Sequence, residues 1–318
     1  MTYLRAGSVF VVALFLAFAV SGQTPSPTAA PAPSGPVSIW KVDDGRPFRT
    51  GEYTFSVAGR TVEQKLASVL MKREMPYRIV LPVDYESAQA KRYPVIYLLH
   101  GLSGHYDNWT SKTSLETYTA NRGVIIVTPE GDDGWYTDST AVPNHYYESY
   151  IIKELIPEID KKFRTIADRD HRAIAGLSMG GYGALKFGMK YPDMFVLAGS
   201  FSGAIGLASV TEKEVPGAIG KSIDTIFGPA GTDVRKSNDP FAIIRTATPE
   251  KIKSLPFLYL DCGTEDFLFQ NNRDFVALLL EKRVRHEYRQ LPGVHDWKYW
   301  DNQVKQFLEV ADGFLGVK

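Results

Sequence analysis

The sequence contains a single cysteine, Cys262, in 318 residues. One cysteine excludes an internal disulfide and cannot build a structural zinc site from several thiolates. Basic and acidic residues number 36 each, so neither charge is in excess. This balance gives no electrostatic case for a nucleic-acid partner or an anionic surface. The sequence has no dense cluster of histidine, cysteine and aspartate residues with the spacing of metal ligands. We therefore expect neither a metal nor another cofactor.

Long apolar runs are also scarce. The run at 9–20 has about a dozen residues, too short to span a bilayer comfortably. It follows Arg5 and precedes small residues, which predicts a signal peptide over 1–22 with cleavage near Ser21 or Gly22; an uncleaved anchor is the alternative. An exported protein without disulfides fits a bacterial envelope or medium. We therefore expect a secreted or periplasmic bacterial protein with no stable membrane span after cleavage.

The remainder of the chain is expected to form one domain. Residues 23–36 are rich in proline, alanine, serine and threonine, a composition that predicts an extended linker. Residues 37–318 then hold enough apolar side chains for one sizeable core. Within them, we expect residues 37–59 to form at most an extra strand or a clasp. Residues 203–254 are the least regular stretch. We expect a cap-like insertion there, beside the functional site, with a short helix or two.

Apolar runs predict the strands of this domain. Residues 61–81 alternate between polar and apolar side chains, as in a pair of antiparallel strands. The continuous apolar runs 95–99 and 124–127 are typical of parallel strands that helices bury on both faces. Further strands are expected at 195–201, 256–261 and 286–291.

Apolar periodicity predicts the helices. One such face repeats every four residues at Tyr147, Ile151, Leu155 and Ile159. Pro157 lies inside this pattern and should kink the helix or restart it. Other helices are expected at 179–191, around 275–279 and at 300–315.

The motif G-x-S-x-G lies between a strand-like run and a helix-like run, as Gly176-Leu177-Ser178-Met179-Gly180. A serine nucleophile at the apex of a tight strand-to-helix turn projects its hydroxyl beyond the edge of the sheet. Such a turn requires small residues two before and two after the serine; a merely structural turn is the alternative. With the order of strands and helices, the motif predicts an α/β-hydrolase fold. That fold has a mostly parallel central sheet, antiparallel N-terminal strands and helices on both faces.

A serine nucleophile needs a histidine base and an orienting carboxylate, which follow it in this fold in the order serine, acid, histidine. Of the six histidines, only His295 both follows the serine turn in the sequence and lies at the carboxyl end of a predicted strand. The acid should follow the strand at 256–261, where Asp261, Glu265 and Asp266 compete. Asp266 is preferred because it lies far enough into the loop to turn toward the histidine, although it could instead cap the next helix.

Two backbone N–H groups are needed to hold the oxyanion of an ester under attack. One should belong to Met179, directly after the nucleophile. The other should come from the loop after the first buried strand, where Leu102 is preferred. Trp109, Trp135 and Tyr136 lie in loops expected near the site and could stack on a sugar or an aryl acid; packing beneath the loops is the alternative.

Six motifs follow one another along the chain. They are Leu98-Leu99-His100-Gly101, Trp135-Tyr136-Thr137-Asp138, Glu154-Leu155-Ile156-Pro157, Ala175-Gly176-Leu177-Ser178-Met179-Gly180-Gly181, Cys262-Gly263-Thr264-Glu265-Asp266 and Gly293-Val294-His295-Asp296-Trp297. Together they resemble the esterase D family, whose members include S-formylglutathione hydrolases, carbohydrate esterases of family one and mycolyltransferases of the antigen 85 type. The resemblance covers residues 66–315.

The resemblance implies Ser178 as nucleophile, His295 as base and Asp266 as acid, with Leu102 and Met179 as oxyanion donors. It implies a serine esterase that forms an acyl-enzyme without a metal or cofactor. Combined with the signal peptide, it favours acetyl, feruloyl or other acyl esters of carbohydrate, either small or linked to polysaccharide. The alternatives are an acyltransferase of the mycolyltransferase type, a thioesterase like S-formylglutathione hydrolase, a siderophore-type esterase and a non-catalytic binding protein. The motifs do not indicate the oligomeric state.

Overall fold

The computed structural model describes residues 60–317. The predicted signal peptide (1–22), the linker (23–36) and the possible clasp (37–59) lie outside the described residues. At the centre of the described part is a sheet with the strand order β1-β2-β4-β3-β5-β6-β7-β8. Its strands are β1 (Thr61–Ser68), β2 (Arg73–Val80), β3 (Val95–Leu99), β4 (Ile125–Pro129), β5 (Arg172–Leu177), β6 (Leu197–Phe201), β7 (Phe257–Gly263) and β8 (His286–Leu291).

The sheet is antiparallel at one end and parallel over the rest. β2 pairs antiparallel with both β1 and β4, and every pair from β4 to β8 is parallel. All residues of β3 and β4 are buried, which explains their continuous apolar sequence, because a strand covered on both faces has no solvent side. β1 lies at the edge and alternates in exposure. The predicted architecture, mostly parallel with antiparallel N-terminal strands, is confirmed.

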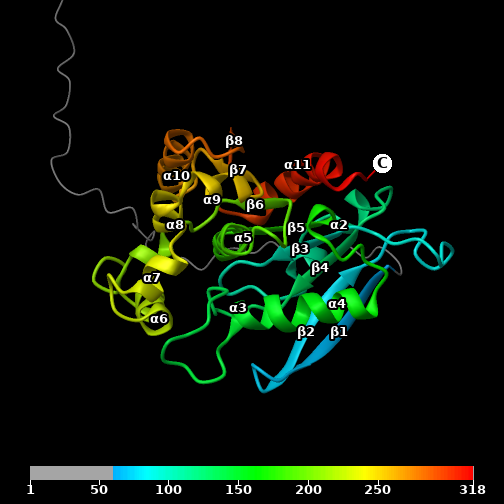
Figure 1. The fold of residues 1–318 in the computed structure, drawn as a ribbon, viewed down its shortest axis with the longest axis horizontal. Coiled ribbons are helices and arrows are strands. Elements are labelled where there is room, and N and C mark those ends of the chain that lie inside the picture. Colours follow the sequence, from blue (N-terminus) through cyan, green and yellow to red (C-terminus); the bar gives the residue numbers. More distant parts are fainter. Residues whose placement is uncertain (1–59, 318) are drawn as a thin grey trace, which may run out of the picture. The chain divides into compact units, whose positions relative to one another are not determined.

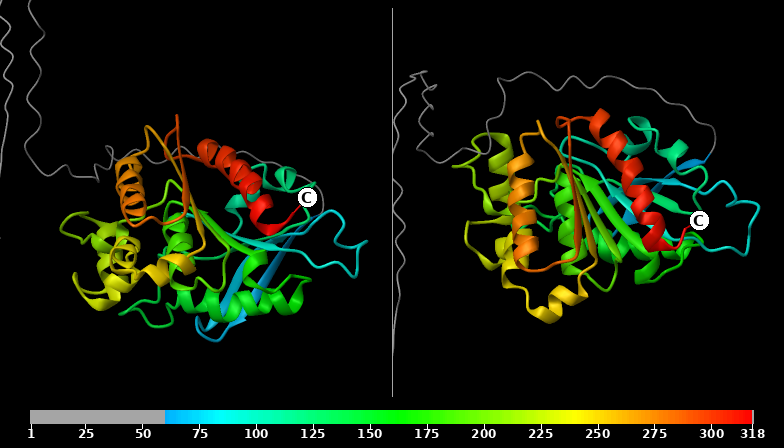
Figure 2. Two further views of the ribbon diagram at one scale, coloured as in Figure 1. Left: turned by 45° about the horizontal axis from the view of Figure 1, so that its top comes forward. Right: turned by 90° about the horizontal axis from the view of Figure 1, so that it is seen from above.

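Helices cover both faces of the sheet, and Figures 1 and 2 show α4 and α11 on opposite sides. One apolar core joins the sheet to α3, α4, α5, α8 and α10, and a second joins it to α1, α2 and α11. No helix among residues 60–317 has the length and apolar character to cross a membrane. The helices are α1 (Asn108–Ser111), α2 (Leu115–Tyr118), α3 (Tyr147–Ser149), α4 (Ile156–Lys162), α5 (Met179–Lys190), α6 (Ala218–Phe227), α7 (Asp233–Asn238), α8 (Pro240–Thr246), α9 (Pro249–Ser254), α10 (Phe269–Glu281) and α11 (Trp297–Leu315).

Pro157 restarts a helix, as its position in the sequence predicted. The chain runs from α3 through a π-helical segment, Tyr150–Leu155, into α4. Pro157 occupies the first turn of α4, where a missing N–H costs no hydrogen bond. The wider π turn absorbs the interruption, and the apolar face from Tyr147 to Ile159 stays buried across it.

The insertion at 203–254 is more helical than predicted. The expectation of a short helix or two was wrong, because this stretch contains α6, α7, α8 and α9. Three of these helices have a side-chain cap at the first turn, from Thr232, Asp239 and Thr248. Local caps of this kind stabilise helices that are too short to show a clear apolar period. α8 packs against α5 and α10, so the insertion shares the main core.

Candidate active site

Ser178 is the single residue between the end of β5 and the start of α5. Its backbone has φ +52° and ψ −114°, a conformation that costs energy for any residue with a side chain. Two backbone hydrogen bonds hold the turn: Ser178 N donates to Phe201 O at 2.9 Å, and Ala204 N donates to Ser178 O at 3.0 Å. The end of β6 therefore supports the strained turn at the carboxyl edge of the sheet.

Gly176 and Gly180 make room for this elbow. A Cβ atom on Gly176 would lie 2.5 Å from the carbonyl carbon of Gly180, and one on Gly180 would lie 2.6 Å from His100 O. Real Cβ atoms do not approach other atoms within 3.0 Å. Any larger residue at either place would push α5 away from β3, which is why the elbow has glycine on both sides.

His295 joins Ser178 to a carboxylate. Its Nε2 lies 3.0 Å from Ser178 Oγ, and its Nδ1 lies 2.8 Å from Asp266 Oδ2. A carboxylate at Nδ1 accepts the ring N–H there, so Nε2 keeps the lone pair that can receive the serine proton. The Asp266 side chain is fully buried and that of His295 is 10% exposed, so water screens their interaction little. The structure thus brings together the three residues that the sequence analysis selected.

Glu265 and Gly293 hold the loops of Asp266 and His295 against each other. Glu265 N donates to Gly293 O at 3.0 Å, and Gly293 N donates to Glu265 Oε2 at 2.7 Å. Asp266 Oδ1 accepts from Leu268 N at 2.8 Å. Asp266 therefore stabilises the turn before α10 but does not cap that helix, whose N-cap is Leu268, and its second oxygen faces the histidine. Glu265, a competing candidate for the acid, bridges the two loops instead.

Two aromatic rings pack against His295. The ring centroid of Trp300 lies 4.9 Å away in an edge-on arrangement, and that of Phe267 lies 4.5 Å away. Trp300 is buried, whereas Phe267 is 48% exposed. An exposed apolar ring therefore lies directly beside the histidine. The sequence analysis missed Phe267, although its place directly after Asp266 was an available signal.

Asp261, the other rejected candidate for the acid, is fully buried on β7. Neither of its carboxyl oxygens has a hydrogen-bond partner among the described residues. Burial raises the pKa of Asp261 well above its ordinary value, because the charged form loses its hydration and the nearby Tyr299 and Tyr259 hydroxyl groups offset this loss only in part. The fold therefore favours the neutral form of Asp261, which is less suited than a carboxylate anion to orienting a histidine by charge.

Because Asp261 is buried, we expect it to make the free energy of unfolding depend on pH, and Asp261→Asn should remove this contribution. The unfolded chain releases the Asp261 proton near pH 4, whereas the folded chain releases it at a higher pH because its pKa is raised. The free energy of unfolding should therefore fall as the pH rises above about 4, by up to about 1.4 kcal/mol per pH unit from this group. Asparagine has a similar shape and no charge, so the variant should lose this part of the slope. Urea unfolding at pH 5, 7 and 9 measures it.

Asp274→Asn is the matched control for that measurement. Asp274 is exposed on α10, so its replacement should leave the pH slope of the wild type in place. Equal slopes for wild type and Asp261→Asn would contradict the raised pKa of the buried Asp261.

The two expected oxyanion donors lie next to Ser178. Met179 is the first residue of α5, where a helix leaves its N–H groups without an intrahelical acceptor. Leu102 follows Gly101, on which a Cβ atom would lie 3.4 Å from the Ser178 Cβ. Among residues 60–317 neither the Met179 N–H nor the Leu102 N–H donates to a protein acceptor. Both donors are thus free to bind an oxygen at the serine.

The three aromatic residues that could have stacked on substrate are buried, which agrees with the alternative that they pack beneath the loops. Trp109 and Tyr136 have no exposed surface and Trp135 is 3% exposed. Trp109 Nε1 donates to Leu99 O at 3.0 Å, and Trp135 Nε1 donates to Ser222 Oγ at 3.0 Å. These side chains pack beneath the loops. Their apolar rings are buried, and the polar N–H groups of the two tryptophans find hydrogen-bond partners.

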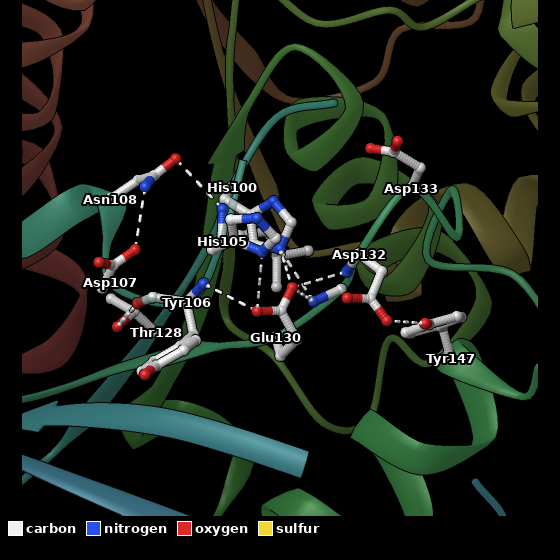
Figure 3. Close-up of polar contacts among 12 residues, drawn as sticks. His100, His105, Tyr106, Asp107, Asn108, Thr128, Glu130, Asp132, Asp133 and Tyr147 are labelled. Carbon is white, nitrogen blue, oxygen red and sulfur yellow. Dashed lines mark hydrogen bonds and ion pairs between the residues drawn. The ribbon is translucent and has the colours of Figure 1, made fainter. Parts of the chain in front are cut away.

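A buried carboxylate, Glu130, braces the loop that follows β3 (Figure 3). Its Oε1 accepts from Asp132 N at 2.7 Å and lies 3.1 Å from His100 Nε2. Its Oε2 lies 3.3 Å from His105 Nδ1. Burial alone would raise the pKa of Glu130, but the nearby His100 ring and the backbone N–H of Asp132 lower it to about 2. Glu130 is therefore an anion that ties this loop to the end of β4.

Within residues 60–317, one group of side chains has its possible ligand atoms close enough together for a metal ion. It consists of His105, Glu130 and Asp132, with these atoms within 4.8 Å of one another. Imidazole with carboxylates suits several divalent metals. However, Asp132 is paired with Arg73 and accepts a hydrogen bond from Tyr147. Since protein groups already balance this charge, we assign the cluster a structural role.

Known proteins similar to this chain include esterases and a serine hydrolase. Residues 68–309 match a protein family described as "Putative esterase". An acetyl esterase of Caldicellulosiruptor saccharolyticus is 28% identical over 252 residues, covering 76% of this chain and 94% of that protein. A solved ferulic acid esterase superposes with a TM-score of 0.68 and 29% identity over 80% of this chain and 98% of the other. FphF, a fluorophosphonate-binding serine hydrolase of Staphylococcus aureus, superposes with a TM-score of 0.70 and 27% identity, over 78% and 96% of the two chains.

Proposed function

Because this chain belongs to the esterase family, we propose that it is a carboxylic-ester hydrolase in which Ser178, His295 and Asp266 form the catalytic triad. The observation that supports the assignment best is the pair of contacts made by His295, at 3.0 Å to Ser178 Oγ and 2.8 Å to Asp266 Oδ2. A serine, a histidine and a carboxylate in this order of contacts make a serine nucleophilic.

In the proposed mechanism, His295 Nε2 takes the hydroxyl proton as Ser178 Oγ bonds to the ester carbonyl carbon. The carbonyl oxygen becomes an oxyanion, which the N–H groups of Leu102 and Met179 bind. Asp266 stabilises the imidazolium that forms. His295 then gives its proton to the leaving alcohol as the bond between carbon and alcohol oxygen breaks. Water, deprotonated by His295, attacks the acyl-enzyme, and the acid leaves as Ser178 regains its proton.

The elbow supports this chemistry in a second way. Ser178 precedes α5, a helix of 12 residues, whose first N–H groups and dipole favour negative charge at its start. The oxyanion would form at this end of the helix. The strained backbone at Ser178 keeps the hydroxyl directed away from the sheet toward His295.

For the substrate, we propose an acetyl, feruloyl or related acyl ester of a carbohydrate. The similarity to an acetyl esterase and to a ferulic acid esterase supports this class. The half-exposed ring of Phe267 beside His295 would contact an apolar part of such an ester. Export through the predicted signal peptide at 1–22 belongs to the same proposal, because polysaccharide esters lie outside the cell.

The test is hydrolysis of p-nitrophenyl acetate and methyl ferulate by the purified protein, with the acids detected by chromatography. We expect both acids to be released, and the ratio of the two values of kcat/KM would describe the acyl pocket. Methanol or a sugar alcohol should be added in parallel, since an acyltransferase would pass the acyl group to the alcohol. Transfer in place of hydrolysis would favour the mycolyltransferase type. A folded protein that releases no acid from either ester would contradict the proposal.

A further inference from the structure

We propose that the segment from Glu130 to Tyr136 sets the position of the oxyanion N–H of Leu102, with Tyr136 and Asp133 as positioning residues. The inference rests on the proposed function. It concerns residues outside the proposed triad. The segment follows β4, and it lies beside the loop His100–Gly104 that follows β3 (Figure 3).

Tyr136 holds one side of the oxyanion loop. Its hydroxyl donates to His100 O at 3.0 Å, two residues before Leu102. Its side chain has no exposed surface, and its ring lies edge-on to the His100 ring with 5.8 Å between centroids. A buried hydrogen bond of this kind restrains the carbonyl, and through the peptide planes on the two sides of Gly101 it restrains the direction of the Leu102 N–H.

Asp133 holds the other side of the same loop. Its Oδ1 accepts from Ser103 N at 2.6 Å, directly after Leu102. Ser103 has φ +58°, a conformation that needs outside support in a residue other than glycine. Leu102 thus lies between two restrained backbone groups, the His100 carbonyl and the Ser103 N–H, and both partners come from one segment.

A buried lysine ties that segment to the helix of the nucleophile. Lys186 Nζ on α5 donates to Tyr136 O at 2.6 Å and to Thr137 Oγ1 at 2.7 Å, and pairs with Glu148 at 2.9 Å. Burial lowers the pKa of Lys186 to about 8, and the Glu148 carboxylate opposes this shift. The lysine therefore remains mostly charged at neutral pH.

Gly183 on α5 completes the attachment. A Cβ atom there would lie 2.7 Å from the Tyr136 ring, so glycine lets the ring rest directly on the helix. Met179 begins α5, and Tyr136 is anchored to the same helix through Lys186. The two oxyanion donors, Met179 and Leu102, are consequently positioned relative to one rigid element, as an oxyanion hole requires.

The first test is Tyr136→Phe, which removes one hydroxyl and keeps the ring. We expect kcat for p-nitrophenyl acetate to fall about tenfold with KM changed by less than about twofold, because a misplaced donor weakens binding of the transition state only. A trifluoromethyl ketone binds as the oxyanion of its serine adduct, in which Ser178 Oγ bonds to the ketone carbon and His295 holds the proton. Its inhibition constant should rise about tenfold in the variant.

Tyr150→Phe is the matched control. Tyr150 is also fully buried in the same apolar core, but its hydroxyl has no hydrogen-bond partner among the described residues. Its replacement should leave kcat and the inhibition constant unchanged. Equal losses in the two variants would show a general effect on the core and overturn the proposal.

Asp133 provides a second test that does not disturb the core, because its side chain is exposed. Asp133→Ala should lower kcat at least about threefold and weaken the ketone. Asp133→Asn keeps an oxygen that can accept from Ser103 N and should restore both values. This pair decides the matter if Tyr136→Phe does not fold.

The inference and the proposed function fail in different ways. Wild-type values of kcat and ketone affinity in folded Tyr136→Phe and Asp133→Ala would overturn the positioning role, even with Ser178 essential. Activity that survives the loss of Ser178 would instead contradict the triad itself.

Discussion

Replacing Ser178 by alanine is expected to lower kcat/KM for p-nitrophenyl acetate by about five powers of ten. Without Oγ no acyl-enzyme forms, and the activity that remains comes from the oxyanion donors and substrate binding alone. The variant should fold, because alanine meets the same backbone strain at φ +52° as serine does. Labelling by a fluorophosphonate should disappear in parallel, and initial rates together with mass spectrometry of the labelled protein measure both effects.

Ser254→Ala is the control for this experiment. Ser254 is exposed at the end of α9, and its replacement should change neither the rate nor the labelling. Activity of Ser178→Ala within about a hundredfold of wild type would show that another group is the nucleophile.

Asp266→Asn should give the second largest loss, about four powers of ten in kcat near pH 7. The amide has nearly the shape of the carboxylate, but it cannot stabilise the imidazolium, and it can present an N–H where Nδ1 needs an acceptor. His295 would then turn the wrong tautomer toward Ser178. KM should change little, since Asp266 Oδ2 contacts the histidine and is buried. Steady-state kinetics with methyl ferulate measures kcat and KM separately.

Glu265→Gln is the comparison for Asp266→Asn. Glutamine keeps an oxygen that can accept from Gly293 N, so the loops should stay together and kcat should fall by less than about threefold. A larger loss in Glu265→Gln than in Asp266→Asn would move the acid to position 265.

The positions of the serine, the acid and the histidine along the chain were predictable from the topology of the sheet. In a parallel sheet the carboxyl ends of the strands share one edge. A serine after β5, an acid after β7 and a histidine after β8 must therefore approach one another. Continuous apolar strands and the elbow glycines indicated that sheet without any knowledge of contacts. The same reasoning separated His295 from the other histidines.

The sequence left two alternatives open for the loop aromatics, because it does not show which side of a loop faces solvent. Trp109, Trp135 and Tyr136 are near the site in the chain but point into the core. The sequence places an aromatic residue in a loop and does not state which way it turns. For the same reason Phe267 was missed, although it is the ring that remains half exposed beside His295.

By itself the sequence determined the succession of strands and helices along the chain, the serine turn and the set of residues that could react, because these depend on local patterns and on the rules of chain topology. Only the tertiary structure decided that Asp261 is buried with a raised pKa, that Glu265 bridges two loops and that Asp266 faces His295. Three carboxyl groups within six residues look alike in the chain. Their burial and partners, which set their charge and direction, come from segments far away in the sequence.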